Sequence, residues 1–131
     1  MNNYDGVVFH VQPCIGTDQL GSCTAVMIVS PKAAILGHVA PRPEGSTYRH
    51  AGDLHVESFM DRFLTYRWTY EDYFPSNANA WVICAIFRGE VALPDQQRII
   101  VTKLRDKGYT VDASRTYEVP YTASNADRGS V

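Results

Sequence analysis

Cys23 and His38 stand fifteen residues apart, and the type and setting of both residues could support thiol chemistry. Cys23 follows Gly21-Ser22, and His38 follows Gly37. An imidazole beside a thiol can accept its proton and leave a nucleophilic thiolate, which is the minimal unit of cysteine catalysis. Spacing alone leaves an ordinary alternative open, because buried cysteines and strand histidines are common parts of a hydrophobic core.

The segment between these two residues predicts a β-hairpin. Two apolar runs, Ala25–Val29 and Ala33–Leu36, flank the break Ser30-Pro31-Lys32. A turn centred on Ser30-Pro31 would place Cys23 directly opposite His38, with Cα atoms about 4.5–5.5 Å apart. The sequence therefore predicts that the thiol and the imidazole meet on one face of a sheet.

Glycines beside both residues favour a site over simple packing. Gly21 predicts a sharp turn that lets the backbone N–H groups of Ser22 and Cys23 face a substrate. These N–H groups are the expected donors to an oxyanion, and Leu20, Gly21 and Ser22 are expected to form the pocket. Gly37 predicts open space above the ring of His38. For Ser22, filling a tight turn is the alternative.

This stretch resembles the bacterial chemoreceptor glutamine deamidase family (CheD). The shared features are Thr17-x-x-Leu20-Gly21-Ser22-Cys23, an apolar strand, a turn containing proline, and Gly37-His38, all within about residues 16–41. Ala85–Gly89 resembles a further family segment more weakly. The chain is also similar to the deamidase domains of toxins of the cytotoxic necrotizing factor type, and its Cys–His spacing equals theirs.

The resemblance implies a layered α/β fold and a cysteine-dependent amidohydrolase that needs no cofactor. Such an enzyme converts a glutamine side chain of a partner protein to glutamate and releases ammonia through a thioester. The resemblance assigns Cys23 as the nucleophile, His38 as the base, and Thr17 as the residue that orients His38. A loop threonine without this resemblance is an ordinary turn residue.

Two other functions stay open at this point. The same Cys–His chemistry could act on another amide, an ester, or a host protein if the chain is an effector. A binding module without catalysis is the second alternative, with Tyr70, Tyr73 and Phe74 as its contact surface. Several residues could compete for the catalytic roles, although a structural role is expected for each: His10, Cys14, His50 and His55.

Composition limits the class of protein. At 131 residues, with 45% apolar and 20% charged side chains, the chain fits one globular domain over residues 1–131. The net charge of −2 argues against nucleic acid or an anionic membrane as the main partner. The three cysteines lack zinc-like spacing, so we expect no metal site and reduced thiols.

The sequence also shows no pattern typical of a targeting signal. The sequence begins without a basic and apolar leader, and no apolar run approaches the roughly 20 residues that a membrane span needs. We therefore expect a cytoplasmic protein without membrane insertion, unless a specialised system exports it.

The remaining chain predicts alternating strands and helices. A β-branched run at Gly6–Val11 predicts the first strand. A helix is expected from about Asp53 because apolar residues recur at helical spacing: Val56, Phe59, Met60, Phe63 and Leu64. The other expected elements are a loop at Pro41–Ser46, a loop at Thr69–Asn79, a central strand at Ala80–Phe87 with a buried Cys84, a helix from Pro94 to Lys107, strands around Tyr109–Ala113 and Tyr117–Tyr121, and a flexible tail at 124–131.

This order predicts an α+β fold. Two helices would pack on a mixed sheet or on a small β-sandwich. The strands of the hairpin that carries Cys23 and His38 are apolar throughout, which suits burial on both faces. We expect the thiol and the imidazole to lie at the rim of the sheet.

Overall fold

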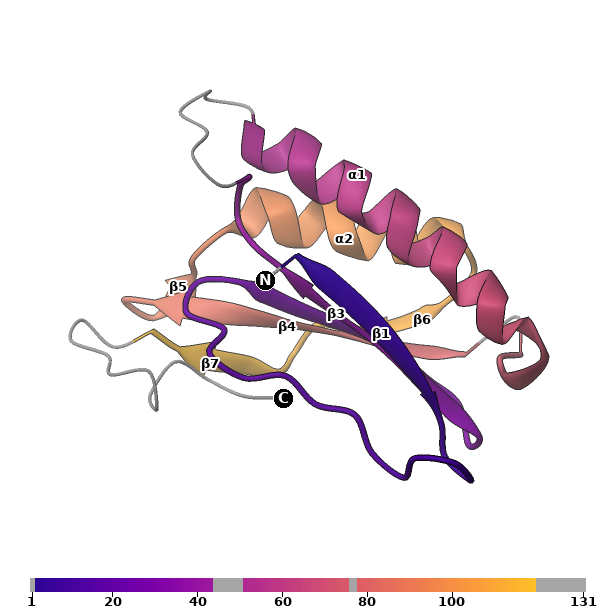
Figure 1. The fold of residues 1–131 in the computed structure, drawn as a ribbon. Coiled ribbons are helices and arrows are strands. Elements are labelled where there is room, and N and C mark those ends of the chain that lie inside the picture. Colours follow the sequence, from indigo (N-terminus) through magenta and orange to yellow (C-terminus); the bar gives the residue numbers. More distant parts are fainter. Residues whose placement is uncertain (1, 44–50, 76–77, 120–131) are drawn as a thin grey trace.

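The computed structural model describes residues 2–43, 51–75 and 78–119 (Figure 1). Its described strands form one mixed seven-stranded sheet, and two α-helices lie side by side over one face of that sheet. The predicted α+β class, with a mixed sheet and two packed helices, is confirmed. None of the described helices is long and apolar enough to cross a membrane.

The sheet runs in the order β1-β3-β2-β4-β5, and β6 and β7 pair in parallel with β4. The strands are β1 (Asn3–Val8), β2 (Thr24–Val29), β3 (Ala33–Val39), β4 (Asn79–Phe87), β5 (Glu90–Val91), β6 (Thr110–Asp112) and β7 (Thr116–Glu118). The helices are α1 (Ala51–Tyr66), the short 3-10 helix η1 (Arg67–Tyr73) and α2 (Pro94–Asp106).

Several predicted boundaries differ from the structure. The first strand occupies Asn3–Val8 rather than Gly6–Val11, because its antiparallel partner β3 begins at Ala33, opposite Val8. The predicted loop after the first helix contains η1. Five predictions lie at least partly outside the described residues: the end of the loop at Pro41–Ser46, His50, positions 76–77 of the loop at Thr69–Asn79, the end of the last strand at Tyr121, and the tail at 124–131.

The β2–β3 hairpin forms as predicted, but its register is different. The two central turn residues are Pro31 and Lys32, and the N–H of Ser30 donates to the carbonyl of Ala33 at 2.9 Å. The Ser30 hydroxyl oxygen also accepts hydrogen bonds from the N–H groups of Lys32 and Ala33, at 3.2 and 3.1 Å. This side-chain cap sets the turn one residue later than predicted.

The register places His38 opposite Ala25, not opposite Cys23. The predicted direct pairing is therefore wrong. Cys23 lies one residue before β2 and two residues before Ala25, so it occupies a position diagonal to His38.

The main core lies between the helices and the sheet. Phe59 and Phe63 of α1 are fully buried against Val26 and Ile35 of the hairpin, and Ile100 and Leu104 of α2 complete the layer. A Cβ atom on Gly37 would lie 3.0 Å from both Phe59 and Val26. Gly37 thus admits a helix side chain on this face. The predicted reason, open space above His38, is wrong.

The aromatic residues after α1 also serve this core. The Tyr70 hydroxyl donates to the carbonyl of Gly6 at 2.9 Å, and Phe74 is buried. Tyr73 packs against the same cluster. These residues cover the edge of the core, and the side chains of Tyr70 and Tyr73 stay partly exposed there. Trp68, which is 72% exposed, is the aromatic side chain that projects from η1.

Candidate active site

The face of the sheet opposite the helices carries a second, smaller apolar cluster. Its buried members are Leu20, Cys23, Ala25, Leu36, Ala40 and Ile83. Side chains alternate along a strand, so His38 shares this face with Leu36 on β3. Cys23 and His38 therefore lie on the same face. In a regular ladder, such diagonal neighbours have Cα atoms about 7–8 Å apart, within reach of long side chains.

Thr17 and His38 are in direct contact. The Thr17 hydroxyl oxygen lies 3.0 Å from Nδ1 of His38. The hydrogen bond is compatible with two tautomers, because a hydroxyl can donate or accept. When Nδ1 carries the proton and donates a hydrogen bond to the Thr17 oxygen, Nε2 keeps its lone pair and can act as a base.

The second ring nitrogen of His38 is buried and unpaired. Nε2 has no hydrogen-bond partner among the described residues, although His38 is only 7% exposed. Buried polar atoms are nearly always paired, and the exceptions occur at functional sites more often than elsewhere. The Cys23 thiol, which was predicted to meet this nitrogen, therefore makes no hydrogen bond to it in this structure.

Burial keeps both candidate catalytic groups neutral. It lowers the pKa of His38, although the charge of Asp18 opposes this effect. Burial likewise raises the pKa of Cys23, which is 3% exposed. Each shift disfavours the charged form, so the resting pair consists of a thiol and a neutral imidazole.

A pocket of about 400 Å³ opens beside His38. Thr17 and His38 line it, together with Asn3 and Asp5 of β1 and Cys14 of the preceding loop. Cys23 is not among its lining residues. The structure thus brings Thr17 and His38 together at a pocket and holds Cys23 in the adjacent apolar cluster.

The loop before Cys23 contains the predicted tight turn. Gly21 has φ +59°, and the N–H of Cys23 donates to the carbonyl of Leu20 at 2.7 Å. Glycine at the first central position suits such a turn because it adopts positive φ without strain. Leu20, at 1% exposed, anchors the turn in the second cluster.

The hydrogen bonds of this turn change which backbone N–H groups could serve as oxyanion donors. The N–H of Cys23 is already bonded within the turn, so it is not available to a substrate. The N–H of Ser22 has no partner among the described residues, and Ser22 is exposed. Of the two amides expected to serve as donors, only that of Ser22 remains.

Sequence reasoning did not identify Tyr117 as part of the site. Its hydroxyl donates to the carbonyl of Cys23, and its ring packs against the second cluster. Tyr117 lies on β7, which pairs with the far side of β4. Alternation around Tyr117 indicated a strand, but no local signal could have indicated a contact 94 residues away.

The competing residues take different positions. His55 Nε2 donates to the side-chain oxygen of Asn2 at 2.8 Å, and the same oxygen accepts the N–H of Ala40. His55 therefore helps to hold the end of β3. His10 is exposed. Cys84 is buried in the main core, as predicted. None of the three cysteines forms a disulfide.

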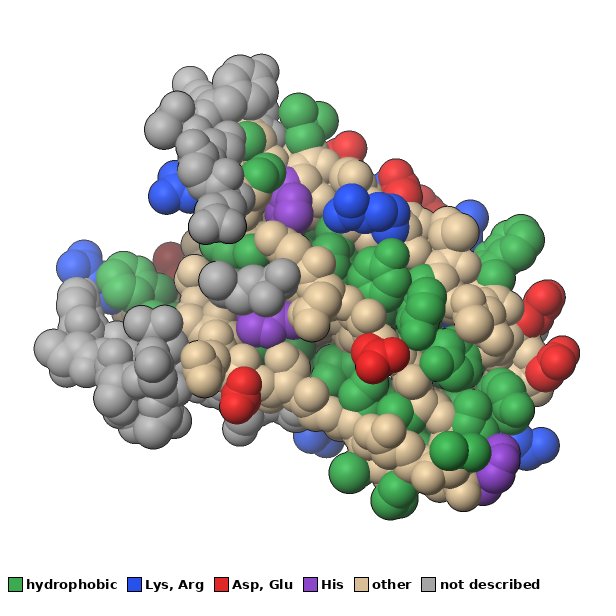
Figure 2. Space-filling model, in the orientation of Figure 1, with side chains coloured by type: hydrophobic (Ala, Val, Ile, Leu, Met, Phe, Trp, Pro, Cys, Tyr) green, Lys and Arg blue, Asp and Glu red, His purple; other side chains and the backbone are tan. Residues whose placement is uncertain are grey.

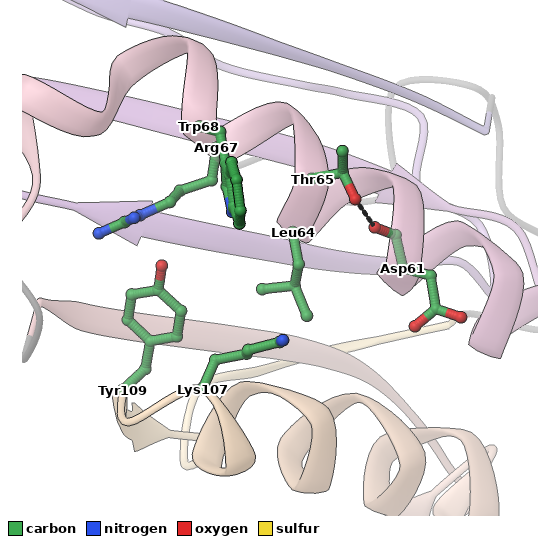
Figure 3. Close-up of a pocket in the computed structure, with 7 residues that line it drawn as sticks. All are labelled: Asp61, Leu64, Thr65, Arg67, Trp68, Lys107 and Tyr109. Carbon is green, nitrogen blue, oxygen red and sulfur yellow. Dashed lines mark hydrogen bonds between the residues drawn. The ribbon is translucent and has the colours of Figure 1, made fainter.

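A larger pocket of about 450 Å³ lies where α1 and α2 end (Figure 3). The labelled side chains include Arg67, Lys107 and Tyr109, with Trp68 beside Arg67. Asp61 at its other end is ion-paired with Lys103 at 2.6 Å. Cations near helix C-termini are stabilised by the helix dipole, which accounts for Arg67 and Lys107. Its lining contains no thiol or imidazole, so it lacks the chemistry of the first pocket.

No group of three or more His, Cys, Asp or Glu residues within the described ranges is arranged to hold a metal ion. No family model matches this sequence. No curated protein matches it either.

Proposed function

We propose that this protein is a cysteine-dependent amidohydrolase that deamidates a glutamine side chain of a partner protein. The contact between Thr17 and Nδ1 of His38 supports this most strongly, because it orients a buried imidazole whose other nitrogen is unpaired. Cys23 on the same face supplies the nucleophile. The resemblance of residues 16–41 to the chemoreceptor deamidases supplies the choice of glutamine.

The reaction proceeds by acyl transfer. Nε2 of His38 accepts the proton of the Cys23 thiol while sulfur attacks the side-chain carbonyl carbon of glutamine. The imidazolium then gives that proton to the amide nitrogen, the C–N bond breaks, and ammonia leaves a thioester. Water, deprotonated by His38, attacks the thioester carbon. The thiolate leaves and is protonated again, so glutamine and water give glutamate and ammonia.

Neighbouring groups have defined parts in these steps. The Thr17 hydroxyl oxygen accepts a hydrogen bond from Nδ1–H and stabilises the imidazolium when it forms. The Ser22 N–H is the proposed donor to the oxyanion. Tyr117 is a positioning residue, since it fixes the carbonyl of Cys23. Because Cys23 is buried, its side chain must turn toward the pocket of His38 before it reacts.

Cys14 is the rival nucleophile. It is exposed and lines the same pocket as Thr17 and His38, whereas Cys23 does not. Cys14 lacks the glycine turn of Cys23, and the bond that its carbonyl accepts from Gln12 at 3.1 Å is exposed. We assign the role to Cys23 for this reason and because Cys23 occupies the motif position. A reduced thiol is required in either case, which fits the cytoplasm.

The substrate of the proposed enzyme is a protein rather than a free amino acid. Charged side chains of the described residues are scattered over the face in Figure 2, between hydrophobic and uncharged polar groups. A mixed surface of this kind is ordinary for a folded protein, so the choice of a protein substrate rests on the resemblance to the chemoreceptor deamidases.

The direct test is ammonia release and the conversion of glutamine to glutamate in a panel of candidate proteins, followed by mass spectrometry. We expect activity in the unaltered chain and in Cys14→Ser, and loss of activity in Cys23→Ser. Activity that disappears in Cys14→Ser but persists in Cys23→Ser would move the nucleophile to Cys14. An unchanged set of targets in both variants would remove the amidohydrolase proposal.

A further inference from the structure

The candidate pocket continues into an apolar groove on the same face of the sheet. This groove has a volume of about 390 Å³, and its floor includes Met27 of β2 with Trp81 and Ile83 of β4. Met27 and Trp81 are directly paired across the two strands. Both side chains are half-buried, so apolar surface is exposed inside a concave site. Such surfaces mark places where another molecule binds.

The groove and the His38 pocket share a wall. Cys14 and Ile15 line both of them. A chain segment that places a glutamine side chain beside His38 therefore continues over Ile15 into the groove. Both hollows lie between the loop before Gly16 and the side of the sheet that faces away from the helices.

The strand geometry sets the spacing between the two subsites. Ala25 lies opposite His38, and Met27 is two residues further along β2. At about 3.3 Å per residue, the floor of the groove begins about 7 Å from the level of His38. Two residues of an extended peptide span that distance, and one helical turn spans about 5.4 Å.

We propose that this groove binds a large apolar side chain of the substrate, two to four residues from the target glutamine. The inference rests on the proposed function and names the sequence context that the site selects. The floor accepts leucine, isoleucine, methionine or phenylalanine. Arg115 lines the groove as its cation and disfavours lysine or arginine at the same substrate position.

The test uses acetylated glutamine peptides that differ at one position only. One series carries leucine two, three or four residues from the glutamine, and matched peptides carry serine or lysine there. We expect the unaltered protein to deamidate the best leucine peptide with kcat/KM about tenfold or more above its serine partner, and the lysine peptide to be poorest. Equal values for leucine and serine would overturn the groove proposal while leaving the deamidase proposal intact.

Single substitutions test whether the groove floor causes the preference for leucine over serine. Met27→Thr shortens the floor while keeping a residue that suits a strand, and we expect it to reduce the leucine-to-serine ratio toward one. Leu54→Thr is the matched control, because Leu54 is a 58% exposed apolar residue on α1, over the other face of the sheet. An unchanged ratio in Met27→Thr, in a protein whose circular dichroism matches the parent, would overturn the proposal.

A binding measurement separates this inference from the catalytic one. In Cys23→Ser with Trp68→Phe, Trp81 is the remaining tryptophan, since the chain has two. We expect the leucine peptide to change its fluorescence at a concentration at least tenfold below that for the serine peptide. This result without turnover by the parent protein would support the groove and count against the deamidase. No difference between the peptides would overturn the groove.

Discussion

The Thr17 hydroxyl and Nδ1 of His38 lie 3.0 Å apart, although 21 positions separate the two residues in the chain. The turn at Leu20–Cys23 and the β2–β3 hairpin together bring them to one pocket. This contact fixes one nitrogen of a buried imidazole and leaves the other nitrogen, Nε2, unpaired. The role of general base that we propose for His38 requires this arrangement.

Removing the Thr17 hydroxyl should lower catalysis without unfolding the protein. We expect Thr17→Ala to reduce kcat by about 10–100-fold, because a hydrogen bond to a charged imidazolium is worth about 1.5–3 kcal/mol. Thr17→Ser keeps the hydroxyl and should restore most of the rate. Steady-state ammonia release measures both. Equal rates in Thr17→Ala and in the parent would show that this contact does not orient the base.

The stability of the protein should fall as the solution becomes acidic. Burial lowers the pKa of His38 and also that of His55 below the ordinary value of 6.5. The native state therefore binds these protons less readily than the unfolded chain, and stability present above pH 6.5 is lost as the pH falls through and below it. Urea unfolding of the parent and of His38→Gln at neutral and acidic pH measures this effect.

In that comparison, His38→Gln should lose less stability on acidification than the parent does. His55→Gln should show a similar reduction, since burial and Arg62 on the same helix lower the pKa of His55. If the parent and His38→Gln weaken equally between the two pH values, His38 is not held neutral by the fold.

The three cysteines should react with iodoacetamide in a defined order. Cys14 is exposed, whereas burial raises the pKa of both Cys23 and Cys84. The thiolate is the reactive form, so at neutral pH we expect Cys14 to be labelled first. Labelling of Cys23 should accelerate as the pH rises, and peptide mapping measures each rate. Preferential labelling of Cys23 at neutral pH would contradict the neutral thiol described above.

Tyr117 should position Cys23 through its hydroxyl. Tyr117→Phe leaves the ring in the second cluster but removes the donor to the Cys23 carbonyl. We expect a loss of about 1 kcal/mol in the free energy of unfolding and a lower kcat with little change in KM. Tyr109→Phe is a suitable control, because Tyr109 is buried in the main core and lines the pocket at the ends of the helices instead. A rate equal to that of the control would remove Tyr117 from the site.

Gly37 should tolerate no larger side chain. Gly37→Ala would place a Cβ 3.0 Å from Phe59, and overpacking of this kind costs about 1–3 kcal/mol. Gly21→Ala meets no atom within 4 Å and is strained only by its φ of +59°. Thermal unfolding of the double variants distinguishes the two causes. Phe59→Leu and Val26→Ala each remove one of the two contacts at 3.0 Å, so each should cost less stability in Gly37→Ala than in the parent, and the same in Gly21→Ala as in the parent. Additive effects in Gly37→Ala would show that these contacts are not the reason for the glycine.

The elements of the fold could be predicted where the pattern is local. The helical spacing of Val56, Phe59 and Phe63 gave the buried side of α1, and the two apolar runs gave the hairpin. The hairpin register could not be predicted, because the Ser30 side chain selects the turn residues. The error shifted the pairing by two positions, and side chains alternate with a period of two. Cys23 and His38 consequently remained on one face.

Contacts between segments far apart in the chain could not be predicted from the sequence. The parallel pairing of β6 and β7 with β4, and with it the contact of Tyr117 with Cys23, depends on where the chain returns after α2. The reason for a glycine at position 37 could not be predicted either, because the close contact comes from Phe59, on a helix that packs on the face opposite His38, together with Val26. The hydrogen bond that occupies the Cys23 N–H follows from the details of one turn.

Trapping the acyl intermediate tests most directly whether Cys23 is the nucleophile. A glutamine peptide mixed with the protein and quenched in acid during turnover should leave the peptide as a thioester on the proteolytic fragment that contains Cys23, as seen by mass spectrometry. We expect that adduct in the parent, more of it when water attack is slowed in deuterium oxide, and none in Cys23→Ser. An adduct on the fragment that contains Cys14, or deamidation without any adduct, would contradict the proposed mechanism.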